Sequence, residues 1–441
     1  MKNSAASSAY VVGTIGLLLA GFILNSLYQV GLYSDGAYYF LGLLSERFYF
    51  VSSWYRLGAI VLTQTFFLAA LHLGATSINI LAMLHSANLV LVPTLCFAAS
   101  TWILRANPLA LVANTVAIAS CYIPVSFYAV GEFNALYALF WLTLALLLFV
   151  ERRDKAYFRL ITGLGLFMVA SYELTVITGL ILAAICACRR AAETQEGTRH
   201  AWKIAIIVFL AGSLYGLAGI VFPRDPANAS SFGRALFELS ENRILFGLCG
   251  ITFLSAIAAY SRPARILALA AVAAGLWLFV ERLHAPISTT ELNLGDQSGQ
   301  RAQVFPILLV AAAGLVVARI RPDWLAFKAG GRAWPLLVPL ATVFLVYGSD
   351  LVAWRGFTRD ICRELQSPSA DASQIAAFFG QNRVIRYGWY WNWPVISVLY
   401  RPVESQRILL DPHYQGWLPF ERPEDAPDIS RYKASSSLCN P

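Results

Sequence analysis

Long apolar blocks constrain this chain more than any other feature of its sequence. At roughly 20 residues each, they are long enough to cross a hydrocarbon layer about 30 Å thick as helices. Charged residues make up only 13% of the chain, against about 25% in soluble domains, so a soluble core cannot absorb this apolar surface. The sequence therefore predicts an all-α polytopic membrane protein with about 11–13 transmembrane helices. The blocks run at about 8–30, 58–75, 78–103, 108–128, 133–150, 158–188, 201–221, 244–260, 264–280, 304–318 and 335–353.

Basic residues gather in the connections between these blocks, which explains the net charge of +8 by membrane topology rather than by nucleic-acid binding. The positive-inside rule places such connections in the cytoplasm. We therefore expect a multi-pass protein of a bacterial inner or plasma membrane, with a cytoplasmic N-terminus and an extracytoplasmic C-terminus. The basic connections carry Arg152, Arg153, Lys155 and Arg159; Arg189, Arg190, Arg199 and Lys203; Arg262 and Arg265; Arg319, Arg321, Lys328 and Arg332.

The block 158–188 has basic residues on both flanks. A single span would put these flanks on opposite sides of the membrane, against the positive-inside rule. The sequence therefore predicts a hairpin of two short helices that turns near Ser171, Tyr172 and Glu173.

The first half of the chain needs an odd number of spans between a cytoplasmic N-terminus and an outer Glu132, yet it has four apolar blocks. Two explanations remain open. Either the block 78–103, which His85, Asn88 and Pro93 interrupt, forms two short helices, or one block enters and leaves on the same side.

Two parts of the chain are predicted to lie outside the membrane. The first outer loop, 31–57, is rich in aromatics, Ser, Glu and Arg in a pattern typical of short interfacial helices. The transmembrane domain is expected to end at residue 353, and the tail 354–441 to form a small α+β extracytoplasmic domain. In that tail we expect a short helix at 372–380 and one or two strands or an aromatic flap at 384–400, with Trp389, Trp391 and Trp393 at period two.

Three acids at the predicted outer face are candidates for chemistry. Asp35, in YSDGAYYF, is expected to be partly desolvated and so a better base, or else to cap an interfacial helix that starts at Gly36. Glu132 binds substrate, or favours the start of a helix through its dipole. Glu173 interrupts an apolar block, so it is functional or forms a salt bridge to Arg47 or Arg56.

The order of these parts resembles the GT-C superfamily of membrane glycosyltransferases. The likeness covers roughly residues 1–190: a first span, an outer loop of interfacial helices that opens with Asp35 in SDGAYYF, and then many spans. It implies a lipid-linked sugar donor, often a polyprenyl-phosphate monosaccharide, and a first-loop carboxylate that acts as base. Because Ser34 stands where several branches have a second acid, Glu46 is the second candidate for the base.

The resemblance implies an inverting transfer from a polyprenyl-phosphate donor to an extracytoplasmic glycan, lipid or protein. Cationic side chains would stabilise the leaving lipid phosphate, and acids and aromatics would bind the sugar or acceptor. No cofactor is required, and no ligand cluster indicates a metal. The phosphate candidates are Arg47, Arg56, His284 and Arg301, each of which is otherwise an interfacial anchor; the sugar or acceptor candidates are Tyr38, Tyr39, Glu132, Glu173, Trp389 and Trp391.

Two other classes of function remain open. A transporter or flippase of a lipid-linked saccharide predicts polar residues spread along a path through the spans, whereas here the acids collect at the predicted outer ends. A non-catalytic scaffold predicts that Asp35, Glu132 and Glu173 are all replaceable.

Cys362 and Cys439 are the two cysteines in the predicted extracytoplasmic tail, where disulfides form and persist. We predict that they are bonded to each other, closing a loop of roughly 78 residues and stabilising the tail by about 4 kcal/mol in the chain-entropy model. Peptide mapping of the unreduced protein by mass spectrometry should find the linked peptides. Recovery of both cysteines as free thiols from unreduced protein would contradict the pairing.

Overall fold

The computed structural model describes residues 4–51, 53–123, 132–151, 153–222, 297–321, 336–366, 392–400, 408–410, 419–420, 422 and 425–432. Throughout this part of the chain the regular structure is helical, with no strand. Two short 3-10 helices lie at Val30–Leu32 and Trp54–Arg56. The α-helices are α1 (Ser4–Leu27), α2 (Asp35–Glu46), α3 (Leu57–His72), α4 (Ile78–Leu104), α5 (Pro108–Cys121), α7 (Glu132–Phe149), α8 (Lys155–Val169), α9 (Thr175–Ala191), α10 (Glu196–Val221), α14 (Gln297–Ile320), α15 (Leu337–Gln366) and α18 (Trp393–Tyr400).

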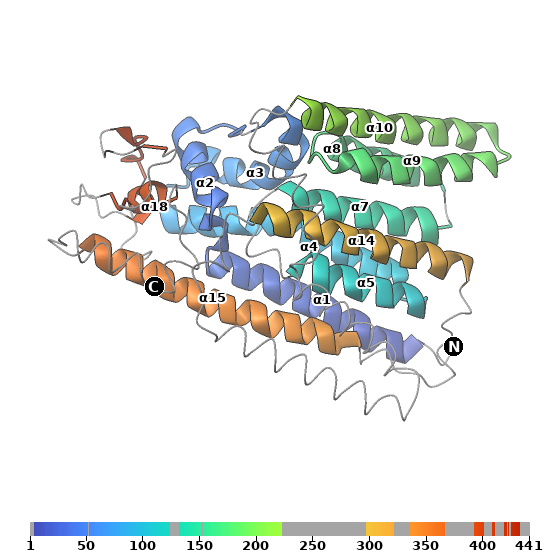
Figure 1. The fold of residues 1–441 in the computed structure, drawn as a ribbon, viewed down its shortest axis with the longest axis horizontal. Helices are drawn as coiled ribbons and strands as arrows, with labels where there is room; N and C mark the ends of the chain where they lie inside the picture. Colours follow the sequence, from blue (N-terminus) through green and yellow to red (C-terminus); the bar gives the residue numbers. More distant parts are fainter. Residues whose placement is uncertain are drawn as a thin grey trace.

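Long apolar helices dominate the described part of the chain and run roughly along one common axis (Figure 1). Five are long and apolar enough to cross a membrane: Ser8–Leu27, Trp54–His72, Ile78–Leu104, Glu196–Val221 and Leu337–Leu365. Three shorter apolar helices lie among them, at Pro108–Cys121, Phe133–Phe149 and Val304–Ile320. The predicted class, an all-α membrane protein, is confirmed. The predicted total of spans stays a prediction, because residues 223–296 lie outside the described residues.

The hairpin predicted for the block 158–188 is present. Helix α8 ends at Val169 and α9 begins at Thr175, so the chain turns at residues 170–174. The hydroxyl of Thr175 closes this turn by donating to the carbonyl oxygens of Tyr172 (2.7 Å) and Met168 (3.1 Å). The charge pattern of the flanks therefore predicted the reversal correctly.

The block 78–103 is one helix, so its predicted division into two short helices is wrong. Helix α4 continues through Pro93. Proline removes a single backbone donor, and neighbouring side chains in a membrane bundle can satisfy the groups it disturbs. Here the Tyr122 hydroxyl lies 2.9 Å from Thr94 Oγ1 and 3.4 Å from the Val90 carbonyl oxygen, directly beside the proline. The alternative of a block that enters and leaves on one side stays a prediction.

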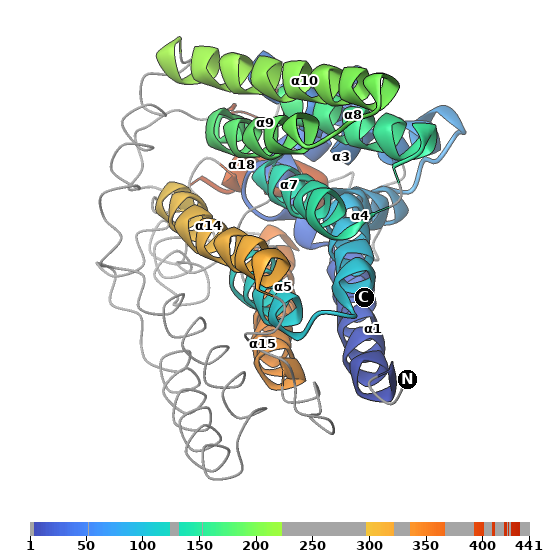
Figure 2. The ribbon, with the colours of Figure 1, turned by 90° about the vertical axis from the view of Figure 1, so that its right-hand side faces the viewer.

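Basic side chains gather at one end of the bundle, which we call the basic end. It holds the start of α1, the α7–α8 and α9–α10 connections and the last turn of α14 (Figures 1 and 2). Arg189 donates to the carbonyl oxygens of Leu147 (3.1 Å) and Leu148 (3.4 Å), which closes the end of α7. Arg153 and Arg319 lie close enough to Arg189 for their charges to interact with its guanidinium. The opposite end carries α2 and the 170–174 turn, and we call it the loop end.

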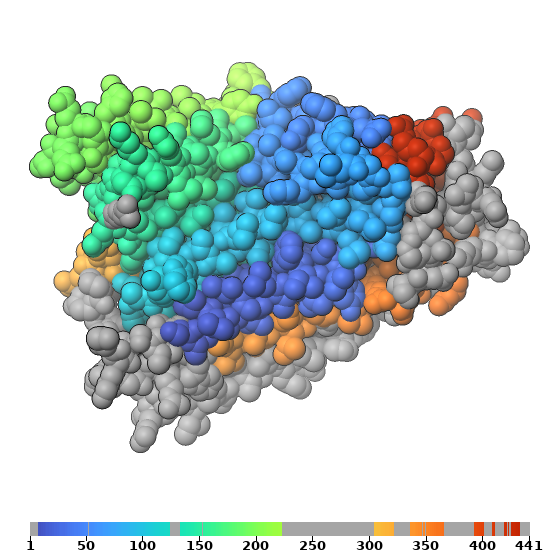
Figure 3. Space-filling view, turned by 180° about the vertical axis from the view of Figure 1, so that it is seen from behind, coloured from blue at the N-terminus to red at the C-terminus, as the bar shows by residue number. Residues whose placement is uncertain are grey.

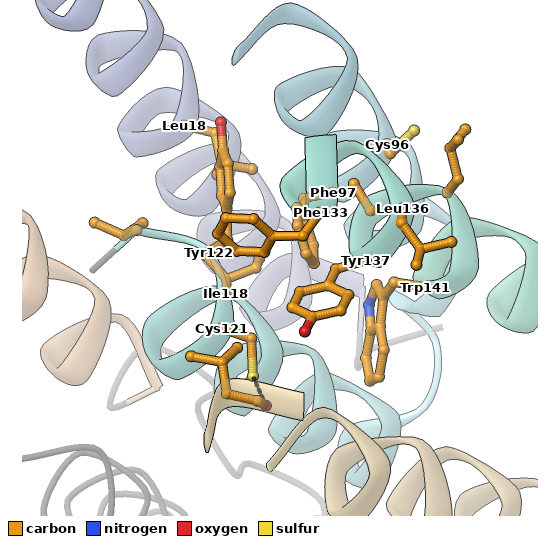
Figure 4. Close-up of a cluster of buried hydrophobic side chains, with 14 of the residues drawn as sticks. Leu18, Cys96, Phe97, Ile118, Cys121, Tyr122, Phe133, Leu136, Tyr137 and Trp141 are labelled. Atoms are coloured by element: carbon orange, nitrogen blue, oxygen red, sulfur yellow. Dashed lines mark hydrogen bonds between the residues drawn. The ribbon is translucent and has the colours of Figure 1, made fainter. Parts of the chain in front are cut away.

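The core between α1, α4, α5 and α7 is built from aromatic and aliphatic side chains (Figure 4). Three of its polar side chains bond to each other. The Trp141 indole donates to Asn114 Oδ1 (2.8 Å), and the Asn114 amide donates to Thr101 Oγ1 (2.9 Å). Cys121 joins α14 to this core through a contact of 3.7 Å from its sulfur to the Val304 carbonyl oxygen. Satisfied polar groups of this kind fix one arrangement of otherwise interchangeable apolar helices.

Two helices lie in the C-terminal region. Helix α15 runs on past residue 353 to Gln366, and the division into domains predicted at that residue stays a prediction. The segment 393–400, expected to be part of a strand, is the fully buried helix α18. Its second residue, Pro394, suits the first turn of a helix, where its missing N–H leaves no bond unmade. Residues 372–380 lie outside the described residues.

Helices α9 and α10 approach closely at Gly179, where an added Cβ would lie 2.6 Å from the Phe209 carbonyl oxygen. We predict that Gly179→Ala lowers stability by about 1–3 kcal/mol, as overpacking does in closely packed interfaces. The measurement is the thermal unfolding of the purified protein in detergent. Gly16→Ala is the matched control, because an added Cβ at Gly16 meets nothing within 4 Å. Equal melting temperatures for the two variants would contradict the prediction.

Candidate functional site

The segment between α1 and α2 is fixed to α4 by its backbone. The Gly31 N–H donates to Ser86 Oγ (2.9 Å), and His85 Nε2 donates to the Gly36 carbonyl oxygen (3.1 Å). An added Cβ at Gly31 would lie 2.8 Å from the Ser86 Cα, so a side chain there would prevent this approach. The His85 ring itself packs against Phe40 of α2, with 5.4 Å between ring centroids. These contacts hold the start of α2 in one position.

Helix α15 holds the same segment from the other side through aromatic contacts. Trp354 donates its indole N–H to the Tyr28 carbonyl oxygen (3.1 Å) and meets the Tyr33 ring edge to face, with centroids 5.6 Å apart. The series continues through Phe357 (5.3 Å) to Trp393 of α18 (5.5 Å). The first loop, α15 and α18 therefore share one aromatic cluster at the loop end.

Asp35 stands at a strained turn in this framework. It is the first residue of α2, and Ser34 before it has φ 52° and ψ −133°. Such a conformation costs roughly 1–3 kcal/mol for a residue with a side chain, and it persists only where surrounding contacts enforce it. The partial positive charge at the helix N-terminus favours a carboxylate at this position. Asp35 is partly buried, so the structure holds a carboxylate in a defined place at the edge of the protein.

The second candidate base, Glu46, lies at the other end of α2. It is the last residue of the helix and is exposed, as is Arg47 after it. Eleven residues of helix at 1.5 Å each separate Asp35 from Glu46 by about 16 Å. The two acids are therefore not placed to act on one reacting bond.

Tyr38 and Tyr39 pack against Phe50, with ring centroids 5.2 and 6.0 Å away. Phe50 is itself fixed by the Gln64 amide, which accepts from the Phe50 N–H (2.9 Å) and donates to its carbonyl oxygen (3.1 Å). Its ring lies over Gly42, where an added Cβ would clash with it. Both tyrosines therefore belong to the folded first loop.

Arg56 and Glu173 form a salt bridge of 3.1 Å, with 17% and 20% of their side chains exposed. This confirms the salt bridge that the sequence left open for Glu173. The Arg56 guanidinium also lies over the Tyr172 ring, 5.0 Å from its centroid. The end of the first loop is thereby attached to the α8–α9 turn.

Helix α7 begins at Glu132, and its next residue, Phe133, contacts Tyr172 with ring centroids 6.1 Å apart. Glu132 therefore starts a helix beside the Arg56–Glu173 pair. Asp35 stands instead at the start of α2, which contacts α4. Helix α3 lies between these two groups of contacts.

The remaining predicted residues lie partly outside the described residues. His284, Trp389, Trp391 and Cys439 are not among them. Arg301 lies near the start of α14, three residues before Val304, which contacts Cys121. Cys362 on α15 is disulfide-bonded, as predicted, while its pairing with Cys439 stays a prediction. Within the described ranges no group of three or more His, Cys, Asp or Glu residues is arranged to hold a metal ion.

The sequence analysis missed Asp350, which is only 5% exposed. Among the residues whose side chains the structure describes, it is the one Asp, Glu, Lys or Arg that is buried. Tyr347 and Trp354, one turn on either side of it, contact Asn25 and Tyr28, so Asp350 lies on the α15 face that meets α1. An acid inside an apolar block is itself a sequence signal for function or pairing, and YGSDLVAW carries it.

Comparison with protein-family models, with curated proteins and with solved structures finds no match to this chain.

The Arg56–Glu173 pair should stabilise the attachment of the first loop to the α8–α9 turn. We predict that Arg56→Gln and Glu173→Gln each lower stability, and that the double variant loses less than the sum by about 1 kcal/mol, the upper range for partly exposed pairs. Thermal unfolding of the four proteins measures this coupling. Additive losses would show that the two side chains do not stabilise each other.

Proposed function

We propose that the chain is an inverting membrane glycosyltransferase that moves a sugar from a polyprenyl-phosphate donor to an extracytoplasmic acceptor, with Asp35 as the base. One observation carries the proposal: Asp35 is presented at a strained turn that α4 and α15 hold from both sides. A catalytic group has to be kept in place by rigid surroundings, because a small displacement lowers the rate strongly.

The proposed reaction is a direct displacement at the anomeric carbon of the donor sugar. The acceptor hydroxyl oxygen attacks this carbon while its proton passes to the Asp35 carboxylate. The bond from the anomeric carbon to the phosphate oxygen breaks, and the polyprenyl phosphate leaves with the electron pair. Attack opposite the leaving group inverts the configuration. No oxidant, reductant or cofactor is needed for this balance.

The leaving phosphate needs a cation near the loop end. Arg56 is engaged by Glu173, and Arg47 lies at the far end of α2 from Asp35. We therefore give this role first to Arg301, on the early turns of α14, and second to His284. Glu132 and the tyrosines of the first loop remain candidates for contacts with the sugar or acceptor.

Two independent features support an extracytoplasmic reaction. The arginines of the basic end favour the cytoplasmic side for that end. Cys362, two turns beyond Trp354 along α15 in the direction of the loop end, is disulfide-bonded, which favours an oxidising compartment. Both favour a position of the Asp35 turn outside the cytoplasm, where lipid-linked sugars are used by the enzymes that this chain resembles.

A transporter of lipid-linked saccharides is the alternative, and the hydrogen bonds of the buried Ser and Thr side chains bear on it. Such a protein needs polar groups along a path through its spans. In the described helices most buried Ser and Thr side chains instead bond to the carbonyl oxygen one turn before them, as Thr143 does to Leu139 (2.7 Å). These groups are satisfied within their own helix, which favours a reaction at the surface over passage.

We predict that Asp35→Asn abolishes transfer while leaving folding unchanged, because the amide keeps the shape but cannot accept the proton. Loss of a general base typically lowers the rate by about 100-fold to 10,000-fold. The measurement is transfer of radiolabelled sugar from a polyprenyl-phosphate donor in vesicles that contain the protein. Thermal unfolding of the same preparation checks that the variant is folded.

Glu46→Gln is the matched control, since it makes the same chemical change at the opposite end of the same helix. It should retain activity near that of the unchanged protein. A fully active Asp35→Asn variant, or an inactive Glu46→Gln variant, would contradict the assignment of the base.

A further inference from the structure

A groove of about 710 Å³ lies between α8 and α10 at the basic end, far from the Asp35 turn. Figure 3 shows the surfaces of these two helices (greens) adjoining at the end of the molecule away from α18 (red). Its walls are one stripe of α8, from Lys155 to Leu166, and the facing residues of α10, from Gly197 to Ile204. Neither the sequence motifs nor the proposed reaction uses this groove.

The groove exists because small residues line it where the two helices diverge. An added Cβ at Gly163 or at Gly197 meets nothing within 4 Å. Two residues further along α8 the helices close, since an added Cβ at Gly165 would lie 2.8 Å from Val208 Cγ1. The opening is therefore confined to one face of the helix pair.

Charge is concentrated at the mouth of the groove, where Arg153, Lys155 and Arg159 face a single carboxylate, that of Asp154. Asp154 accepts the Tyr157 N–H (2.9 Å) and so caps α8. Arg153 is held in place by Glu193 (3.8 Å).

Lys155 and Arg159 are exposed, and within the described part of the chain neither has an ion-pair partner. An anion at the mouth would therefore meet uncompensated positive charge.

Beyond the mouth the lining is mainly apolar, with the hydroxyls of Thr162 and Thr198 as its polar groups on the two helices. Phe158, Leu166 and Ile204 line it, and 60% of Leu166 and 41% of Ile204 are exposed. From Arg159 to Leu166 this part of the groove follows about 10 Å of helix, at 1.5 Å per residue. One leaflet of a hydrocarbon layer about 30 Å thick is about 15 Å deep, so the groove would hold roughly the first two thirds of an acyl chain.

We propose that this groove binds one anionic glycerophospholipid of the cytoplasmic leaflet, with its phosphate at Lys155 and Arg159 and an acyl chain along the apolar part. The charge at the mouth and the apolar length behind it match the two halves of such a lipid. Basic pockets between helices on the cytoplasmic side bind anionic headgroups in this manner. A soluble phosphate compound would use the mouth but leave the apolar length empty.

The experiment uses the full chain, purified in neutral detergent and freed of lipid. It is titrated with dioleoyl-phosphatidylglycerol, dioleoyl-phosphatidylcholine or glycerol 1-phosphate, and the Kd follows from the rise in Tm. We expect stabilisation by phosphatidylglycerol alone.

The double variant Lys155→Gln, Arg159→Gln should weaken phosphatidylglycerol binding about thirtyfold. This factor corresponds to about 2 kcal/mol, because each of the two lost cations contributes about 1 kcal/mol to binding. Gly163→Leu keeps the charges but fills the groove, so it should weaken binding by at least about tenfold. The matched control, Arg199→Gln with Lys203→Gln, removes two exposed cations of the same end that do not line the groove, and it should bind normally.

Three results would overturn the proposal. An equal loss in the control pair would indicate diffuse attraction to the basic end. Equal stabilisation by glycerol 1-phosphate would indicate a site for soluble phosphates. Full phosphatidylglycerol binding by Gly163→Leu would show that no acyl chain enters the groove. The Tm of each variant without lipid establishes that the variant is folded.

Discussion

The backbone of the segment between α1 and α2 has to find hydrogen-bond partners within the protein, and the rest of the loop end depends on this constraint. Water is scarce at the edge of a hydrocarbon layer, so unpaired peptide groups are expensive there. Ser86 and His85 supply partners from α4, and Trp354 supplies one from α15. The strained Ser34 backbone is stable only because these bonds enforce it.

That constraint links regions far apart in the chain. Once Trp354 is fixed on the first loop, the aromatic series through Phe357 to Trp393 places α18 beside α2. Tyr432 adds a bond of 2.8 Å from its hydroxyl to the Leu44 carbonyl oxygen, so the last described residues also return to α2. The proposed base therefore lies where the first loop, α15 and α18 meet.

The overall class and the α8–α9 reversal could be predicted from the sequence because they depend on local quantities. Block length and the sign of flanking charges decide whether a segment crosses a membrane and in which direction. The path of α4 through Pro93 and the helical state of 393–400 could not be predicted in this way. In α4 the Tyr122 hydroxyl reaches the groups beside the proline from a different helix, and in α18 burial overrides the strand preference of aromatic and β-branched residues.

For the candidate site, the sequence by itself determined which side chains are available: an acid next to a glycine after the first span, an acid in the turn at 173, and basic residues in the connections between apolar blocks. Only the tertiary structure decided their roles. It paired Glu173 with Arg56, separated Glu46 from Asp35 by the length of α2, and buried Asp350 on the face of α15 that meets α1. The reason is physical: charge, length and hydropathy are properties of residues and short segments, whereas a partner is set by which helices pack together, and that depends on the whole bundle.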